Sequence, residues 1–307
     1  MGEKSWTYKT TLPKAPSDDG VVTFLAFDGL DTFATVKLNG KVILESDNMS
    51  VPHRVDVTGL LEASTDNILE IDFASALLRA REIMAEHPDH KYVLFNGEPA
   101  RLCVRKAQYH WGWDWGPVLM TAGPWRAVRL ESYQSKIEDL WVEYDVDISS
   151  KAVKGTIFTK IENPTGVSVT VNVSLQDNVF SGSGEPDSDG LVKVDFKVPD
   201  VKLWYPHGYG AQPLYEFSVD LLAGEKELDS KTKKIGLRKV ELVQEPDDIG
   251  KTFFFRINGV DVFCGGSDWI PADNFVPRIT EEKYRKWIQM MVHGNQVMIR
   301  YASSLQP

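Results

Sequence analysis

The sequence predicts a mostly β protein in which two antiparallel sandwiches precede a single strand–helix piece. Short apolar or alternating runs recur from residue 21 to residue 240, and clusters of Gly, Pro, Asn and Ser separate them. The dipeptide Asn-Gly occurs at 39–40 and at 258–259 between such runs, which strongly indicates two-residue β-hairpins. A clear amphipathic helix pattern appears only near the end of the chain, at 281–293.

Residues 1–133 predict one antiparallel β-domain. Runs that alternate or are rich in Val, Ile, Phe and Leu predict strands at 21–27, 32–38, 41–44, 53–57, 68–73 and 125–130. Residues 75–86 break this pattern with good helix formers, and Pro88 follows, so a short helix is expected there.

Residues 134–244 predict a second all-β domain with the strand spacing of an immunoglobulin-like sandwich. The expected strands are 140–148, 155–161, 167–175, 191–198, 214–222 and 231–240, with turns at 162–166 and 181–186. We expect this domain to be a spacer without chemistry, and His207 to be a structural hydrogen bonder.

Residues 245–307 predict a different architecture. A hairpin at 253–264 is followed by a helix that begins after the N-cap Thr280 and stops at Gly294. Its apolar face has the spacing i, i+3, i+4 and i+7, from Tyr284 to Met291. Residues 295–300 then predict the start of a further strand.

Composition excludes several classes of partner. The net charge is −10 and no basic run occurs, which argues against nucleic acid and anionic membranes. No apolar run reaches 18 residues, so no membrane span is expected. The first residues lack an apolar signal-peptide region, which predicts a cytoplasmic location, and Cys103 and Cys264 are then expected to be reduced thiols.

The most unusual stretch is Trp-Gly-Trp-Asp-Trp-Gly-Pro at 111–117. In an extended chain, Trp111, Trp113 and Trp115 would share one face and Asp114 the other, with Gly116 and Pro117 ending the strand. Flat aromatic faces suit the C–H faces of a sugar, and a carboxylate accepts hydrogen bonds from its hydroxyls. A tryptophan ladder in a sandwich core, with Asp114 in a turn, is the alternative.

This stretch, preceded by Val-Arg-Lys-Ala-Gln, closely resembles the β-mannosidases of glycoside hydrolase family 2, of the intracellular fungal type. The resemblance extends from Trp6 to about Arg300, and its other motifs are at 25–40, 203–217, 235–242 and 253–275. It implies a galactose-binding-like jelly roll at 1–133 whose first strands are missing, and an immunoglobulin-like domain at 134–244. It also implies the start of a (β/α)₈ barrel at 245–307, so that the chain is truncated at both ends.

The resemblance also implies the substrate-binding residues. In the family, the tryptophan-rich loop reaches the active site of the barrel and binds the terminal mannose, which assigns Trp113, Asp114 and Trp115. The motif after the second hairpin assigns Asp268, where many relatives carry asparagine, and Trp269 as a stacking surface under the sugar ring. A barrel-mouth core residue is the alternative for Trp269.

No catalytic residue is expected in this chain. A retaining glycosidase needs two carboxyl groups about 5–5.5 Å apart. In the resembled family both are glutamates on later barrel strands, one after an asparagine, and this chain contains no Asn-Glu dipeptide. The sequence lacks metal-ligand and phosphate-loop spacings, so no cofactor is expected.

The reading is therefore a fragment of a retaining exo-β-mannosidase that binds β-mannoside oligosaccharides and is inactive alone. The alternatives are a fragment of another family 2 exo-glycosidase and a non-catalytic carbohydrate-binding protein. The sequence does not indicate an oligomeric state. Because an incomplete barrel leaves strand edges and the helix face uncovered, we expect residues after about 265 not to hold a native fold.

Overall fold

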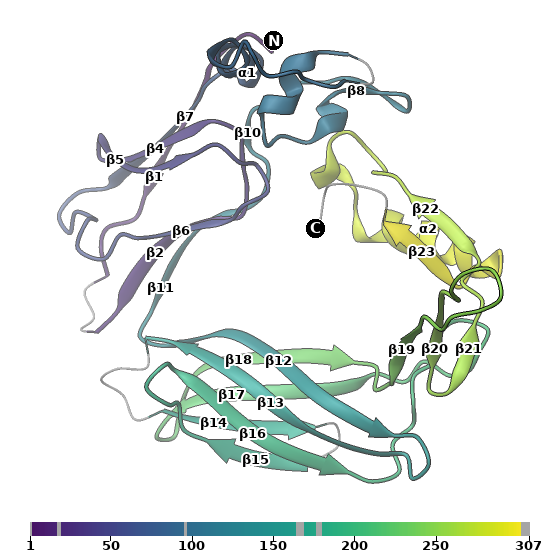
Figure 1. Cartoon of the computed structure of the whole chain (residues 1–307). Coiled ribbons are helices and arrows are strands. Elements are labelled where there is room, and N and C mark those ends of the chain that lie inside the picture. The colour runs from purple at the N-terminus through teal and green to yellow at the C-terminus, as the bar shows by residue number, and fades with distance from the viewer. Residues whose placement is uncertain (1, 17–19, 95–96, 164–168, 176–179, 302–307) are drawn as a thin grey trace. The chain divides into compact units, whose positions relative to one another are not determined.

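The computed structural model describes residues 2–16, 20–94, 97–163, 169–175 and 180–301 (Figure 1). The chain divides into two compact units. The first contains Met1–Tyr133, Trp269–Tyr284 and Tyr301–Pro307, and the second contains Gln134–Asp268 and Arg285–Arg300. Most of the regular structure is antiparallel β, as the sequence predicts.

The first unit is a two-sheet sandwich. One sheet has the order β1 (Trp6–Leu12), β7 (Asn67–Phe73), β4 (Ala34–Leu38), β5 (Lys41–Ser46), and the other β11 (Val128–Tyr133), β2 (Val22–Phe27), β6 (His53–Asp56) (Figure 1). Alternate residues of both sheets point inward, and Leu25, Phe27, Val36 and Phe73 are completely buried in one apolar core. Period-two alternation therefore places this core correctly.

The hairpin and the helix of this unit follow from local signals. Asn39 and Gly40 have φ of 51° and 81°, which is the left-handed backbone of a type I′ turn between β4 and β5. Helix α1 (Ala76–Glu86) begins where Ser75 Oγ accepts a hydrogen bond from the backbone N–H of Leu78 at 3.1 Å. Both predictions are confirmed.

The sequence patterns missed strand β1 and two short strands, β3 (Leu30–Asp31) and β10 (Gly123–Pro124). Most residues of β1 are exposed at the edge of the sheet, and four of its seven residues are Thr or Lys, so its alternation is weak. Two 3₁₀ turns, η1 (Pro99–Cys103) and η2 (Gln108–His110), were also not predicted.

The second unit contains another sandwich. Its sheets have the orders β12 (Lys136–Asp147), β13 (Ala152–Glu162), β16 (Leu191–Val198) and β15 (Phe180–Gly184), β14 (Val169–Leu175), β17 (Tyr215–Ala223), β18 (Lys226–Ile235). Inward residues of both sheets, including Ile157, Phe196 and Phe217, form its core. The predicted strand 167–175 is described from Val169, and most of the predicted turn at 162–166 lies outside the described residues.

The turn predicted at 181–186 is wrong over its first four residues, because residues 180–184 form strand β15, paired with β14. Gly182 and Gly184 in this strand allow the side chains of the facing sheet to pack directly against the backbone. A Cβ atom at Gly182 would lie 2.8 Å from Cγ1 of Val194, and one at Gly184 would lie 2.8 Å from Cγ1 of Val192.

The strand predicted at 231–240 is also wrong at its end. Strand β18 stops at Ile235, and a separate strand β19 (Val240–Val243) begins after a short connection. Gly236 in that connection packs against Trp204, whose ring atoms would be 2.7 Å from a Cβ at this position. The chain leaves the sheet here because the indole lies against its backbone.

The last part of the chain forms the elements that its sequence predicts. Strands β20 (Phe254–Ile257) and β21 (Val260–Val262) flank Asn258 and Gly259, which have positive φ. Strand β22 (Gly266–Trp269) pairs with β23 (Met298–Tyr301), and the turn η3 (Val276–Arg278) lies between them. Helix α2 (Glu281–His293) has the predicted bounds, and Thr280 Oγ1 accepts from the N–H of Lys283 at 3.3 Å.

The expectation that residues after 265 hold no native fold needs correction. Asn274 and Val276 contact the core of the first unit, so this part of the tail is anchored. Helix α2 itself buries none of its residues, and Trp287 and Ile288 remain 37% and 45% exposed. Among the described residues, no helix has the length and apolar character that crossing a membrane requires.

Candidate functional site

The tryptophan-rich stretch forms a tight β-hairpin. Strand β8 (Trp111–Trp113) pairs with β9 (Gly116–Val118), Trp113 faces Gly116 across the pair, and Asp114 and Trp115 make the turn. The prediction of one extended strand ended by Gly116 and Pro117 is therefore wrong. Gly116 lies in the returning strand, where the Asn274 amide would be 3.1 Å from a Cβ atom.

The three tryptophans occupy three different environments, so the predicted single aromatic surface is also wrong. Trp111 is 4% exposed and packs in an apolar cluster with Ala80, Ala100 and Val104. Trp115 packs against the ring of Tyr109, with ring centroids 5.4 Å apart. Trp113 is 41% exposed, which makes it the indole of the hairpin that a ligand can reach.

Trp113 is held from one side by a buried cation. The guanidinium carbon of Arg101 lies 5.2 Å from the centre of the Trp113 ring, and Arg101 itself is 3% exposed. A guanidinium over an aromatic face is attractive, and burial strengthens this attraction. The contact fixes the orientation of the exposed indole at the tip of the hairpin.

Asp114 lies exposed at the tip of the same hairpin. Within the described part of the chain, no hydrogen bond or ion pair is seen at its carboxylate. Four acceptor positions on its two oxygens are therefore open to a ligand. The pair Trp113 and Asp114 thus offers an apolar face beside a charged acceptor, which is the combination that a sugar ring needs.

The other two candidate residues are not on this hairpin. Asp268 belongs to the second unit, is exposed, and lies 3.4 Å from Nη1 of Arg300. Trp269 belongs to the first unit, is 9% exposed and stacks on Tyr284 at 5.7 Å. In this chain Trp269 packs as a core side chain, and its role in stacking on sugar stays a proposal.

A buried polar cluster supports the base of the hairpin, and the sequence patterns missed it. Lys106 Nζ donates to Asp31 Oδ1 at 2.6 Å, to the carbonyl of Thr121 at 2.9 Å and to its Oγ1 at 2.9 Å. The side chains of Lys106 and Asp31 are 0% and 1% exposed. Burial lowers the pKa of Lys106, and the charge of Asp31 opposes this shift. These partners lie 75 and 15 residues apart from Lys106, so spacing could not reveal them.

His110 links this cluster to the tail of the chain. Its Nε2 lies 3.0 Å from the carbonyl oxygen of Asn274, which can only accept, so Nε2 carries a proton. Nδ1 lies 3.2 Å from Oγ1 of Thr121. Burial, and then the charge of Lys106, lower the pKa of His110 to about 4, while Asp31 and the Asn274 carbonyl oppose the shift. His110 is therefore neutral at pH 7 and holds the hairpin base to residue 274.

This pKa predicts how stability depends on pH. An unfolded histidine takes up a proton near pH 6.5, but His110 in the fold does so only near pH 4. Between these values the unfolded state binds more protons, so stability is full above pH 6.5 and is lost as the pH falls. From pH 7 to pH 5 the free energy of unfolding of the first unit should decrease by about 2 kcal/mol.

Urea unfolding at both pH values measures this difference. His110→Gln, whose amide can still donate to Asn274, should remove most of the decrease. Equal decreases in the wild type and the variant would show that His110 is not the responsible group.

Two family models match this chain. A glycosyl hydrolase 2 galactose-binding domain-like model matches residues 1–126, and a model of glycosyl hydrolases family 2 matches residues 135–238. β-Mannosidase B of Aspergillus clavatus is 54% identical over 303 residues, and that of Aspergillus terreus is 55% identical over 301 residues. Each match covers 98% of this chain and 36% of the relative.

A solved structure agrees with these matches. The β-D-mannosidase from Dictyoglomus thermophilum aligns with a TM-score of 0.82 and 32% identity, over 97% of this chain and 37% of that one. The two family models fall on the two β-sandwiches, residues 1–126 on the first and residues 135–238 on the second. The chain belongs to glycosyl hydrolase family 2, and the predicted fold class is confirmed. It spans 36% of the length of the curated relatives that it matches.

Proposed function

We propose that this chain provides part of the substrate-binding side of a retaining exo-β-mannosidase. The enzyme would remove terminal, non-reducing β-D-mannose residues from oligosaccharides. The observation that carries the proposal is the 54% identity over 98% of the chain to an enzyme named β-mannosidase B. Identity at this level over both sandwiches and the tail favours a mannosidase over other family 2 exo-glycosidases and over a binding protein without catalysis.

In this proposal, the tip of the hairpin contacts the terminal mannose. The exposed ring of Trp113 would pack on a C–H face of the sugar, and Asp114 would accept from a hydroxyl. Trp115 would set the shape of the turn through its contact with Tyr109. Asp268 and Trp269 are the further proposed binding residues, from the segment that follows the second Asn-Gly hairpin.

The division of labour within the chain is also a proposal. Residues 1–133 would carry the hairpin, residues 134–244 would act as a spacer, and residues 245–307 would begin the catalytic barrel. The two family models match residues 1–126 and 135–238, which supports this division. The anchoring of Asn274 to His110 indicates that the third segment helps to hold the hairpin of the first.

We also propose that the protein is cytoplasmic. Both cysteines, Cys103 and Cys264, are free thiols, which fits a reducing compartment. Fractionation of cells that express the gene with an epitope tag would test this, and recovery of the tagged protein in the culture medium would contradict it.

Asp114→Ala in the complete enzyme tests the role of the hairpin. A charged hydrogen bond that strengthens in the transition state should cost about 2–4 kcal/mol in kcat/KM when it is lost. The substrate is an aryl β-mannoside. Asp89→Ala, which removes another exposed aspartate of the first unit, is the matched control and should leave kcat/KM unchanged. Wild-type kinetics for a folded Asp114→Ala enzyme would reduce Asp114 to a turn residue.

A further inference from the structure

A hollow lies on the first sandwich, outside the residues of the hairpin. It opens on the outer face of the sheet formed by β1, β7, β4 and β5, near the start of helix α1. Its volume is about 800 Å³, within the range of small-molecule sites in proteins. It lies in the first unit alone, and its lining residues include Trp6, Phe33, Asp47, Asp72 and Arg79.

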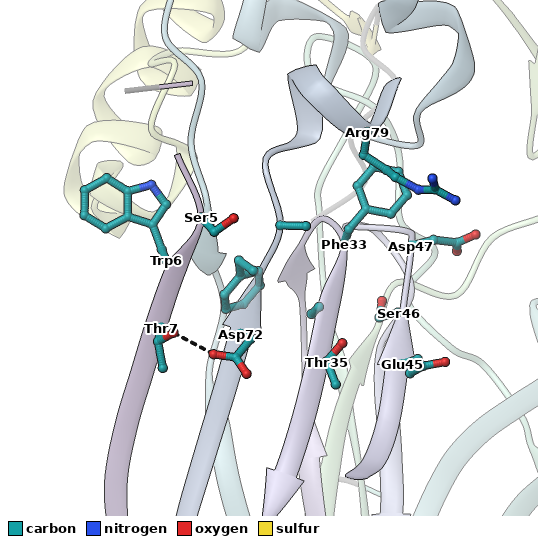
Figure 2. A pocket seen from close by; sticks show the side chains of 13 residues that line it. Ser5, Trp6, Thr7, Phe33, Thr35, Glu45, Ser46, Asp47, Asp72 and Arg79 are labelled. Atoms are coloured by element: carbon teal, nitrogen blue, oxygen red, sulfur yellow. Dashed lines mark hydrogen bonds between the residues drawn. The ribbon is translucent and has the colours of Figure 1, made fainter. Parts of the chain in front are cut away.

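The floor of this hollow is one row of polar side chains across four strands. Thr7 pairs with Asp72, Asp72 with Thr35, and Thr35 with Glu45, each on the neighbouring strand. Figure 2 shows the four side chains next to one another on the same face of the sheet. Adjacent strands are about 4.8 Å apart, so the row is about 14 Å long, which exceeds a single sugar ring. We call Thr7, Asp72, Thr35 and Glu45 the polar row.

The centre of the polar row is held in a fixed geometry. Asp72 accepts from Thr7 Oγ1 at 2.6 Å and from Lys37 Nζ at 2.6 Å. The hydrogen bond from Lys37, and then that from Thr7, lower the pKa of Asp72. Lys37 Nζ also lies 3.5 Å from Oε1 of Glu70, which is two residues before Asp72 on β7 and points to the same face of the sheet. Asp72 is thus an oriented, ionised acceptor, which reduces the cost of ordering it around a ligand.

The rest of the hollow supplies further polar groups and an apolar edge. Glu45 and Asp47 are exposed on and just after β5, and Arg79 lies over Phe33 at the helix end of the hollow (Figure 2). The indole of Trp6 is 41% exposed at the β1 edge. The lining carries three carboxylates and one guanidinium, and Lys37 neutralises the charge of Asp72, so no surplus of positive charge attracts an anion. The hydroxyl and carboxylate groups of the lining suit a neutral ligand that carries many hydroxyl groups.

We propose that this hollow is a second carbohydrate site that binds a short, neutral, β-linked oligosaccharide. Carboxylates and threonine hydroxyls in a row across strands can accept from and donate to successive hydroxyls of such a chain. The site would retain oligosaccharides on the enzyme without taking part in their hydrolysis. The choice of a manno-oligosaccharide rests on the proposed function, whereas the hollow and the polar row do not depend on it.

The proposal is tested by titrating the 307-residue chain with β-1,4-linked mannotriose and measuring the dissociation constant by calorimetry and ligand-observed NMR. The double variant Thr35→Val, Glu45→Gln removes one hydroxyl and one charge from the polar row without changing shape. It should weaken binding at least about tenfold, as expected for the loss of charged and neutral hydrogen bonds. Circular dichroism verifies that the variant folds.

Two control variants locate the binding. Thr232→Val removes an outward threonine hydroxyl that lies 3.1 Å from Ser218 on the second sandwich, and should change nothing. Asp89→Ala, which removes an exposed aspartate of the first unit that does not line the hollow, should also leave this affinity unchanged. Failure of the wild-type chain to bind, unchanged affinity of the double variant, or equally weakened binding in either control variant would each overturn the proposal.

A second probe separates this proposal from the proposed function. β-1,4-linked cellotriose offers the same linkage with glucose in place of mannose. If the complete enzyme releases no mannose but the polar row still binds either trisaccharide, the carbohydrate site stands and the proposed function fails. If the enzyme releases mannose and neither trisaccharide binds the chain, only the second site fails.

Discussion

The 307-residue chain is expected to release no mannose from an aryl β-mannoside above the blank. Retaining hydrolysis needs a nucleophile and an acid/base carboxyl about 5–5.5 Å apart. The chain contains no Asn-Glu dipeptide, with which the family resemblance marks the acid/base, and Asp114 and Asp268 match binding positions. Typical enzymes accelerate their reactions by at least about 10⁶-fold, so most of the rate should be missing.

Assay of the purified chain with an aryl β-mannoside measures this rate. The control is the same preparation carrying Asp114→Ala, because a contaminating host enzyme would be unaffected by that change. Turnover that copurifies with the chain and falls in the variant would mean that the chain holds its own catalytic carboxyls.

Lys106→Met is expected to destabilise the first unit by about 3–5 kcal/mol. The Lys106 and Asp31 side chains are 0% and 1% exposed, so the variant leaves the Asp31 carboxylate buried without its counter-ion. The hydrogen bonds from Lys106 to Thr121 are lost as well. Urea unfolding at pH 7 measures the loss.

Two comparison variants separate this effect from the loss of any lysine. Lys234→Met breaks an ion pair with Glu216 in which Nζ and Oε2 are 3.6 Å apart and the two side chains are 65% and 46% exposed. This change should lower the free energy of unfolding by at most about 1 kcal/mol. The double variant Lys106→Met, Asp31→Asn should cost less than the two single changes added together, because no buried charge is left unpaired. A Lys106→Met chain as stable as Lys234→Met would refute a structural role for the pair.

Elements with local determinants could be predicted from the sequence. The Asn-Gly turns require only the left-handed φ that both residues adopt, and α2 has the bounds that Thr280 and Gly294 predict. Period-two alternation located the sandwich cores, since burial on one face of a strand repeats with that period. These predictions needed no knowledge of distant residues.

The errors arose where distant residues decide the structure. Gly182 and Gly184 favour a turn in isolation, but Val194 and Val192 of the facing sheet leave no room for side chains there. The alternation of Trp111 and Trp113 predicts a common aromatic face, yet only Trp111 is buried in the cluster with Ala80 and Val104. No local pattern contains this information.

The same limit applies to the candidate site. The composition of the hairpin, with Trp113 and Asp114 adjacent, pointed to sugar chemistry before the turn itself was known. The polar cluster of Asp31, Lys106 and His110 that supports it could not be found, because its members come together only in the folded sandwich.

The substrate preference of the complete enzyme that contains this chain tests the proposed β-mannosidase activity most directly. The measurement is kcat/KM for matched aryl β-glycosides of mannose, galactose, glucuronic acid and glucosamine. The β-mannoside is expected to be hydrolysed most efficiently, and Asp114→Ala is expected to reduce its kcat/KM by a factor equivalent to about 2–4 kcal/mol. A higher kcat/KM for any of the other three glycosides would contradict it.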